Sequence, residues 1–370
     1  AFLRFPSEIR KERERLMSDK GLEYLTQAML ASSENDSAKA KKKLDRARKF
    51  LPDSPLPRLL QLQLAGRDKN PELAHQQFVQ LQQFESTKPL ALRGLAEQAR
   101  RQGNMDEALI HTEALLEQAP NQSSTQRLAI DLFSYHRRWQ EALKQVKQAY
   151  AQDNLTSDEY KRAKATIAMQ QATLMQKERD RQGAINMLKK AFSTDPSFQP
   201  AAILYAELLA QIGKSSAAAK ILRKAWKYAP HPDIAKTYLA LFDEEGDIKK
   251  QTKRMQELAK QNSDAIESQI LQAEAALMLE NWEIARNFLK VALSKQTTVT
   301  LCQLMAKLSK RGDANEEEER RWLDKAITAT PDANWYCTHC GHQPSEWKAH
   351  CGECYDFSSI NWQPDRALIG

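Results

Sequence analysis

The chain has 370 residues, of which 41% are hydrophobic and 28% are charged, and its formal net charge is +7. A chain of this length can bury a substantial core, and the composition excludes a wholly disordered protein. No stretch approaches the roughly 18 consecutive apolar residues that span a bilayer, which excludes a membrane span within these residues. The 11 glycines are few, and the abundance of Ala, Leu, Gln, Lys and Glu is typical of helices.

The amino terminus opens on Ala1 with "AFLRFP", followed directly by the charged "SEIRKERERL". We expect a processed or trimmed start, with a preceding segment that is missing from this chain. A basic stretch at this place is typical of the cytoplasmic flank of a membrane anchor. The alternative, equally favoured by the residues alone, is the charged first helix of a soluble protein.

A sequence repeat organises the chain up to residue 331. The pattern A-x3-L-x2-A-x4-P recurs in strict or looser form, with its first position at Ala40, Ala74, Ala108, Ala142, Ala184, Ala218, Thr252, Ala285 and Glu319. A period of about 34 residues is the signature of the tetratricopeptide repeat (TPR). We therefore predict an all-α fold: a TPR-like superhelical solenoid of about nine helical hairpins over residues 1–331, followed by a small metal-knuckle module over residues 332–370.

The residue types of the repeat have a physical explanation. Small alanines seven positions apart let paired helices approach closely, and the apolar residue between them fills the gap. The proline at the end cannot continue the helix and begins the turn into the next unit. Gly103 and Gly213, five residues before the alanine position, are expected to relax the turn inside the hairpin. Each hairpin alone leaves an apolar face in water, so neighbouring hairpins must stack.

One interval of the repeat is irregular, because 42 residues separate Ala142 from Ala184. Residues 157–183 contain no internal Gly or Pro before Gly183, and Ser157 can cap a helix there. The eight extra residues correspond to about two helical turns. We expect a longer first helix in the fifth hairpin, which would disturb the groove at that point.

The end of the chain concentrates four of the five cysteines in the motif "WYCTHCGHQPSEWKAHCGECYDF". Two CxxC turns that face one another can enclose a tetrahedral site of four sulfurs, so we predict one metal ion bound by Cys337, Cys340, Cys351 and Cys354. Zinc is the default ion, iron is the alternative, and two disulfides are the other structural possibility. Metal binding would supply much of the folding energy of so short a segment.

The surroundings of the cysteines predict a structural module. Its aromatic residues are expected to pack as a shell around the metal, and His339, His342 and His350 to stand beside a site that four sulfurs already complete. Gly341 is expected at a positive φ. We expect the module to cap the end of the solenoid or to project from it as a recognition element. A complete sulfur shell leaves no open coordination position, so the sequence predicts no catalytic residues and no enzyme.

The groove of the solenoid is predicted to bind a protein partner. Positions 11 and 15 residues before two alanine positions carry Glu97 and Arg93 in one hairpin, and Asp131 and Arg127 in the next; Arg100 lies one turn further along the same face. Such charges could hold an extended or helical peptide. The alternative is that they are ordinary surface charges that pair weakly with each other.

The remaining candidates have simpler explanations. The scattered His75, His111, His136 and His231 are interpreted as solvated or partly packed, and Cys302 as a small buried hydrophobe. The basic run 39–49 raises nucleic-acid binding as an alternative function, but it is interpreted as the solvated face of a repeat helix. No small-molecule substrate is predicted.

Three stretches resemble a known family. "GLEYLTQAMLASSENDSAKAKKKLDRARKFL", "LRGLAEQARRQGNMDEAL" and the tail "WYCTHCGHQPSEWKAHCGECYDFSSINW" resemble bacterial HemY-type TPR proteins. The resemblance implies a non-enzymatic scaffold, anchored in the bacterial inner membrane with its soluble part in the cytoplasm and associated with haem or tetrapyrrole biosynthesis. The alternative resemblance is to LapB-type adaptors, which also end in a rubredoxin-like four-cysteine module and couple lipopolysaccharide synthesis to a membrane protease. The tail's "EW" and "INW" favour the first.

Overall fold

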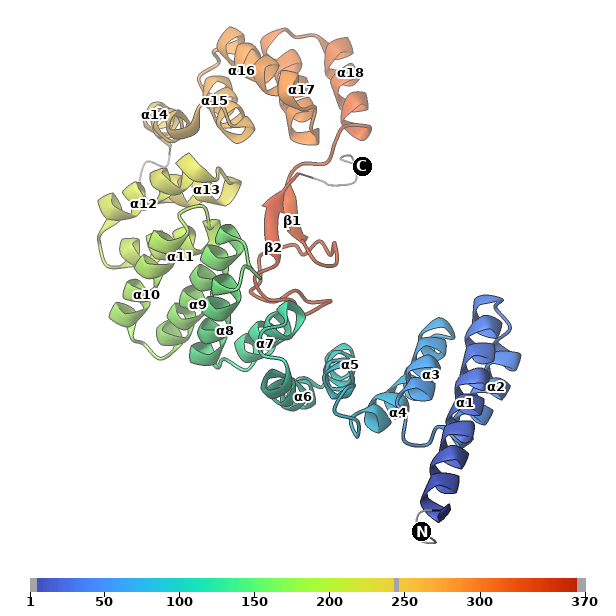
Figure 1. Cartoon of the computed structure of the whole chain (residues 1–370). Helices are drawn as coiled ribbons and strands as arrows, with labels where there is room; N and C mark the ends of the chain where they lie inside the picture. Colours follow the sequence, from blue (N-terminus) through green and yellow to red (C-terminus); the bar gives the residue numbers. More distant parts are fainter. Residues whose placement is uncertain (1–4, 243–245, 365–370) are drawn as a thin grey trace. The chain divides into compact units, whose positions relative to one another are not determined.

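The computed structural model describes residues 5–242 and 246–364. Within them the chain forms eighteen α-helices, one 3-10 turn and two short strands (Figure 1). The helices are α1 (Phe5–Ser33), α2 (Ser37–Phe50), α3 (Leu56–Arg67), α4 (Pro71–Leu81), α5 (Lys88–Arg101), α6 (Met105–Gln118), α7 (Ser123–Tyr135), α8 (Trp139–Ala151), α9 (Ser157–Lys177), α10 (Arg181–Thr194), α11 (Gln199–Gln211), α12 (Ser215–Tyr228), α13 (Pro232–Ala240), α14 (Ile248–Ala259), α15 (Ile266–Met278), α16 (Trp282–Lys295), α17 (Val299–Gly312) and α18 (Glu316–Ile327).

Consecutive helices pair into nine hairpins, from α1–α2 to α17–α18. The chain divides into two compact units, Ala1–Phe133 and Ser134–Gly370, and the boundary between them falls inside α7. The predicted fold class is thus confirmed. The predicted boundary after residue 331 falls between α18 and the first strand.

The repeated alanines form the core of each hairpin. Ala40, Ala108 and Ala218 have no exposed surface, and the leucines four positions later, such as Leu44 and Leu222, are equally buried. Close approach of the two helices leaves room for little more than a methyl group at the first position. In the seventh hairpin Thr252 occupies the first alanine position. Its buried hydroxyl donates a hydrogen bond to the carbonyl of Ile248 at 2.8 Å.

The turn inside every hairpin has the same backbone conformation. A residue with positive φ precedes each second helix, at Asn35, Lys69, Gly103, Arg137, Arg179, Gly213, Gly246, Glu280 and Ala314. Gly103 and Gly213 adopt φ of 79° and 74°, as their position in the repeat predicts. An Asn or Asp often follows as the N-cap; Asp36, for example, accepts a hydrogen bond from the amide of Lys39 at 2.9 Å. The turns therefore confirm the repeat register on both sides of the long interval.

The long interval contains α9, which has 21 residues against 12–14 in most of the other helices. The prediction of a longer first helix is confirmed, but its predicted cap is wrong. Thr156 is the N-cap, and it forms a capping box in which its side chain accepts from the amide of Glu159 while that carboxylate accepts from the amide of Thr156. The reciprocal pair satisfies two amides at once, which a cap at Ser157 would not do. Among the described residues, no helix is both long and apolar enough to cross a membrane.

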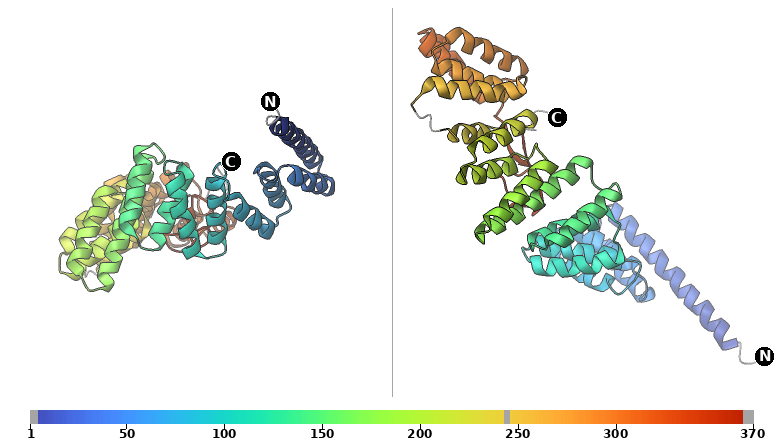
Figure 2. Two further views of the ribbon diagram at one scale, coloured as in Figure 1. Left: turned by 60° about the horizontal axis from the view of Figure 1, so that its bottom comes forward. Right: turned by 90° about the vertical axis from the view of Figure 1, so that its left-hand side faces the viewer.

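The end of the chain forms an antiparallel pair of strands, β1 (Asn334–Cys337) and β2 (Ile360–Gln363), in which Trp335 faces Trp362. The strands lie alongside the fifth to seventh hairpins (Figure 1, Figure 2). The expectation that the module caps the end of the solenoid is therefore wrong. The module turns back instead because its aromatic side chains find apolar partners on α9 and at the beginnings of α11 and α13.

Candidate metal centre and its docking surface

The four predicted cysteines converge at one point. Their sulfur atoms all lie within 4.8 Å of one another. The Sγ atoms of Cys337 and Cys354 are 3.6 Å apart, and so are those of Cys340 and Cys351. All four cysteines are free thiols. A disulfide would need about 2.05 Å between sulfurs, so the predicted disulfide alternative does not describe this structure.

The two CxxC turns have the same backbone geometry. The amide of Gly341 donates to the carbonyl of Cys337 at 2.9 Å, and the amide of Tyr355 donates to the carbonyl of Cys351 at 3.1 Å. Gly341 and Tyr355 both have positive φ, of 76° and 59°. The role of Gly341 is confirmed, while the equivalent role of Tyr355 was hidden because tyrosine is not a residue type that favours this conformation.

The surroundings of the sulfur atoms shift the pKa of Cys337 and that of Cys354 in opposite directions. Burial opposes ionisation of Cys337, but a hydrogen bond with the hydroxyl of Ser359 and hydrogen bonds from the amides of Cys340 and His339 lower the pKa of the thiol. Burial, followed by the neighbouring sulfurs, raises the pKa of Cys354. Burial and neighbouring sulfurs thus oppose ionisation of Cys354, which a bound cation would favour.

The arrangement fits a metal ion held by four thiolates. Zinc–sulfur bonds of about 2.3 Å in a tetrahedron place the sulfurs about 3.8 Å apart, close to the two 3.6 Å separations found here. Cys337, Cys340, Cys351 and Cys354 would hold such an ion, which would fasten the two turns together. Four sulfur ligands would leave no coordination position for a substrate, as in structural zinc sites.

Arg162 links the module to the solenoid. From α9, its Nη1 donates to Oδ1 of Asn361 on β2 at 2.9 Å, and its Nε donates to Oδ2 of Asp195 at 2.6 Å. One turn along α9, the hydroxyls of Thr166 and Ser358 are 2.9 Å apart. The first half of α9 therefore provides the polar contacts of the docking surface. In the sequence, the irregular interval of the repeat indicated that α9 is unusual. The module residues that α9 contacts, Ser358 and Asn361, lie almost 200 positions further along the chain.

Trp347 supplies the apolar part of this surface. Its ring meets Phe198 edge to face at 5.1 Å, and it packs on small buried residues of α9 and α11, among them Ala165, Ala168 and Ala201. Three alanines side by side leave a shallow depression that an indole ring can fill. The predicted aromatic shell is present, because Trp335, Trp347 and Trp362 pack with the cysteines, and the rings of Trp347 and Trp362 also contact the repeats.

His231 is the least expected member of the surface. It is only 2% exposed, and its ring lies 4.2 Å from Trp362 and 5.2 Å from Trp335, centroid to centroid. Its Nδ1 accepts from the amide of Asp233 at 3.1 Å, which makes it the cap of α13. Burial lowers the pKa of His231 to about 4, and the nearby carboxylate of Asp233 offsets only part of this effect. The imidazole is therefore neutral at pH 7.

The predicted groove residues lie on α5 and α7. Arg100 and Asp131 form an ion pair of 3.0 Å between these helices, with side-chain exposures of 17% and 8%. Arg93 donates to the hydroxyl of Ser124 at 3.2 Å, and Glu97 lies 3.8 Å from Arg101 of its own helix. Arg127 lies on the exposed surface of α7. Among these residues, Arg100 and Asp131 stabilise the stacking of two hairpins.

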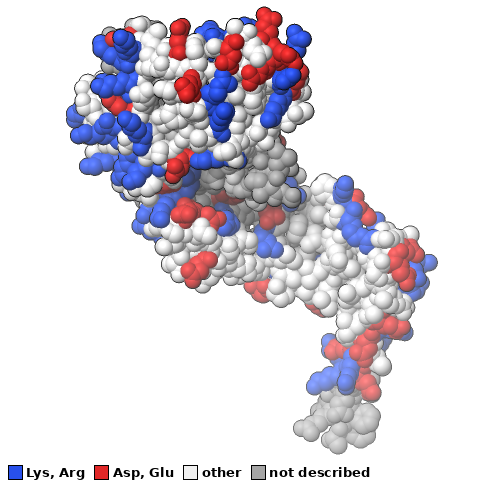
Figure 3. All heavy atoms as spheres, turned by 90° about the horizontal axis from the view of Figure 1, so that it is seen from above, with Lys and Arg blue, Asp and Glu red and all other residues white. Residues whose placement is uncertain are grey.

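The other candidates are mostly explained by packing. Cys302 is fully buried, as predicted. In the basic run, Lys41 pairs with Asp68 at 2.9 Å and Arg48 donates to Gln61 at 3.0 Å, so part of it stabilises neighbouring hairpins. On the face drawn in Figure 3, lysine and arginine are interspersed with aspartate and glutamate. A single basic field of the kind that follows a nucleic-acid backbone is not seen on that face.

Comparisons with known proteins extend these observations. A family model described as tetratricopeptide repeat matches residues 175–240. The chain is 24% identical over 200 residues to the probable magnetosome protein Mms48 of Magnetospirillum gryphiswaldense, covering 53% of this chain and 44% of that protein. It thus spans less than half the length of that curated relative.

Solved structures with similar helical arrays include the TPR domain of P58(IPK), with 15% identity over 84% of this chain and 88% of the other, at a TM-score of 0.25. They also include PilF of Pseudomonas aeruginosa, with 14% identity over 65% of this chain and 99% of the other, at a TM-score of 0.29. The family match covers the hairpins from the end of α9 to α13, and the same turn geometry recurs on both sides of it. The chain therefore has a TPR-like helical fold, part of which matches the tetratricopeptide-repeat family model, and its described residues include a four-cysteine cluster.

Proposed function

We propose that this chain is a non-enzymatic scaffold that binds other proteins through its helical repeats. The observation that carries the proposal is the run of helical hairpins within each of the two units, since stacked hairpins present extended surfaces for recognition by peptides or helices. The only cluster of potential metal ligands among the described residues is a four-sulfur site of structural type. The module adds rigidity where it packs on the fifth to seventh hairpins.

The metal is proposed to be zinc, with iron as the alternative, because both accept four thiolates in a tetrahedron. Thiolates persist in a reducing compartment. We therefore place the chain in the cytoplasm, joined to the inner membrane by a segment outside the residues given. The charged amino-terminal stretch and the resemblance of the tail support this placement.

Within the scaffold class, the resemblance of the tail and of residues 92–109 favours a HemY-type protein associated with haem or tetrapyrrole biosynthesis. The alternative is a LapB-type adaptor that regulates lipopolysaccharide synthesis through a membrane protease. Both hypotheses make the same statement about this chain: its repeats hold a partner and it performs no chemistry.

Affinity capture of the full-length protein from its own cells, followed by mass spectrometry, tests the proposal. A scaffold predicts one or a few proteins retained in near-stoichiometric amounts, compared with cells that lack the tagged protein. Enzymes of tetrapyrrole synthesis among them would support the HemY-type hypothesis, and a membrane protease the LapB-type one. Purified protein that retains no partner and that turns over a substrate would contradict the scaffold function.

A further inference from the structure

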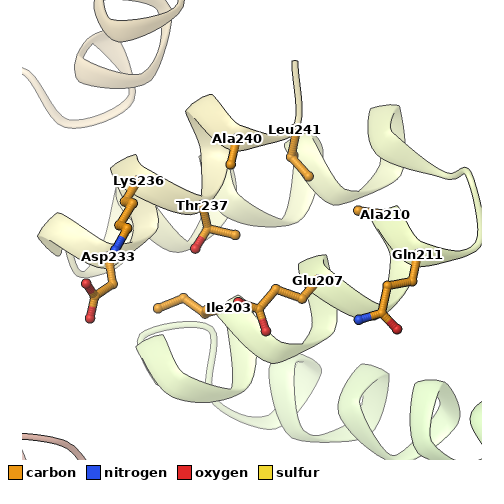
Figure 4. Close-up of a pocket in the computed structure, with 9 residues that line it drawn as sticks. All are labelled: Ile203, Glu207, Ala210, Gln211, Asp233, Lys236, Thr237, Ala240 and Leu241. Atoms are coloured by element: carbon orange, nitrogen blue, oxygen red, sulfur yellow. The ribbon is translucent and has the colours of Figure 1, made fainter. Parts of the chain in front are cut away.

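Two cavities adjoin on the first helices of the sixth to eighth hairpins. One, of about 560 Å³, lies between α11 and α13 (Figure 4); the other, of about 640 Å³, is lined by α13, α14, α15 and residues of the module. Lys236 lines both, so the cavities are neighbours along α13. They are large enough for several side chains of a bound segment.

The same repeat positions line both cavities. Ile203 and Glu207 of α11 lie 15 and 11 residues before Ala218, and Ile270 and Glu274 of α15 lie 15 and 11 residues before Ala285. Because the members of each pair are four residues apart, they lie on one face of their helix. Figure 4 shows Ile203 and Glu207 next to one another on α11, across the cavity from residues of α13. An aliphatic and an acidic side chain therefore recur together along this surface.

Charge on the surface is strongly unbalanced. The lining residues include five carboxylates but one ammonium group, that of Lys236; the carboxylates belong to Glu207, Asp233, Glu267, Glu274 and Asp332. Burial raises the pKa of Glu207, of Glu267 and of Glu274. None of these three has an ion-pair partner in the part of the chain that the structure describes, and Lys307 offsets the burial of Glu274 only partly. Glu267 and Glu274 are partly buried, whereas Glu207 is exposed at its cavity. A partly buried carboxylate without an ion-pair partner is poorly solvated and is stabilised when a cation reaches it.

We infer that this surface binds a segment of a protein partner in which arginine or lysine alternates with aliphatic residues. The aliphatic side chains would contact Ile203, Leu241 and Ile270, and the basic groups would form charge-assisted hydrogen bonds with Glu207 and Glu274. The inference rests on the proposed scaffold function and names the chemistry of the partner. Since the whole chain carries a net charge of +7, attraction of a basic segment must come from this local surface.

The test uses the metal-loaded full chain and three fluorescein-labelled dodecapeptides: four repeats of Leu-Arg-Ser, of Leu-Glu-Ser and of Ser-Arg-Ser. Fluorescence anisotropy in about 50 mM salt gives their dissociation constants. We expect Leu-Arg-Ser to bind best, with each of the other two weaker by about tenfold or more, since each removes one of the two chemistries.

The matched variants are Glu207→Gln/Glu274→Gln in the cavities and Glu280→Gln/Glu283→Gln on the exposed surface outside them. Both pairs remove two charges and keep side-chain volume. The first should weaken Leu-Arg-Ser by about tenfold without lowering the melting temperature, because it removes poorly solvated charges; the second should change binding less than about twofold. The inference would be overturned if the Leu-Glu-Ser peptide bound as tightly as the Leu-Arg-Ser peptide. It would also be overturned if the two double variants weakened binding of the Leu-Arg-Ser peptide equally. The scaffold function would survive that result if affinity capture still retained a partner.

Discussion

Arg162 of α9 donates to Asn361 of β2 at 2.9 Å, joining residues 199 positions apart in the sequence. The same guanidinium donates to Asp195, whose side chain is only 10% exposed. One arginine therefore holds the module and neutralises a buried carboxylate of the solenoid. This double role distinguishes the docked module from a separate domain on a linker.

The first prediction concerns that arginine. Asn361→Ala removes one hydrogen bond and should weaken docking by about 1 kcal/mol. Arg162→Ala removes the same hydrogen bond and should weaken docking by at least as much. It should also lower the stability of the solenoid, because it leaves the buried Asp195 without its charged partner. Hydrogen exchange of the backbone amides in β1 and β2 measures how readily the module undocks from the repeats. Arg181→Ala, at an exposed position, is the control; equal protection in all three variants would contradict the role of Arg162.

The second prediction concerns the metal. Elemental analysis of the purified chain should find about one zinc ion per molecule, with iron as the alternative. Cys351→Ser should abolish binding and unfold the module, because the ion supplies most of its folding energy. Cys302→Ser is the control and should keep the metal. Circular dichroism should remain helical in both. Chains with disulfides and no metal would contradict the prediction.

The third prediction is a pH dependence of docking. The pKa of His231 is about 4 when the module is docked and about 6.5 when the ring is in water. The docked state holds the neutral ring, so this contribution is complete above pH 6.5 and is lost as the pH falls towards 4. The loss amounts to about 3 kcal/mol. Fluorescence of the tryptophans that contact the ring reports undocking.

A non-titrating variant separates this effect from protonation of the cysteines, which also accompanies acidification. His231→Gln should have weaker docking at neutral pH and a smaller change between pH 6.5 and 4 than the wild-type chain. Identical pH profiles of the two chains would show that His231 does not titrate on undocking.

The fourth prediction separates the roles of the groove arginines. Reversal of Arg93 and Arg127 to glutamate should weaken binding of a native partner with little change in melting temperature. Arg100→Glu should lower the melting temperature, because it places a second carboxylate against the buried Asp131. Pull-down and thermal unfolding measure the two effects. If the Arg93/Arg127 variant bound the native partner as well as the wild-type chain, these two residues would not belong to the partner-binding surface.

The sequence predicts those features that depend on local spacing. Alanine positions define the hairpins, glycine at 103 and 213 marks left-handed turns, and the two CxxC pairs define the cluster of sulfurs. The docking surface could not be predicted in this way. Arg162 and Thr166 resemble any exposed residues of a helix, and only the folded chain brings them to Asn361 and Ser358.

The histidines show the same limit. Nothing near His231 in the sequence indicates that it is buried, because the two indole rings that cover it lie more than 100 residues further along the chain. Long-range packing of this kind is set by which apolar faces remain uncovered after the hairpins stack. The long interval of the repeat indicated where the docking surface lies, but it did not indicate that the cysteine module binds there.

A disulfide trap tests most directly the central claim that the metal module is docked on its own repeats. The hydroxyls of Thr166 and Ser358 are 2.9 Å apart, so Thr166→Cys/Ser358→Cys in the metal-loaded chain should form a disulfide under mild oxidation. Thr173→Cys/Ser358→Cys, two turns or roughly 10 Å further along α9, should not. Mass spectrometry of peptides linking α9 to residue 358 in the first variant alone is the predicted result. Failure of the first variant to cross-link, or equal cross-linking of both, would contradict the docked arrangement.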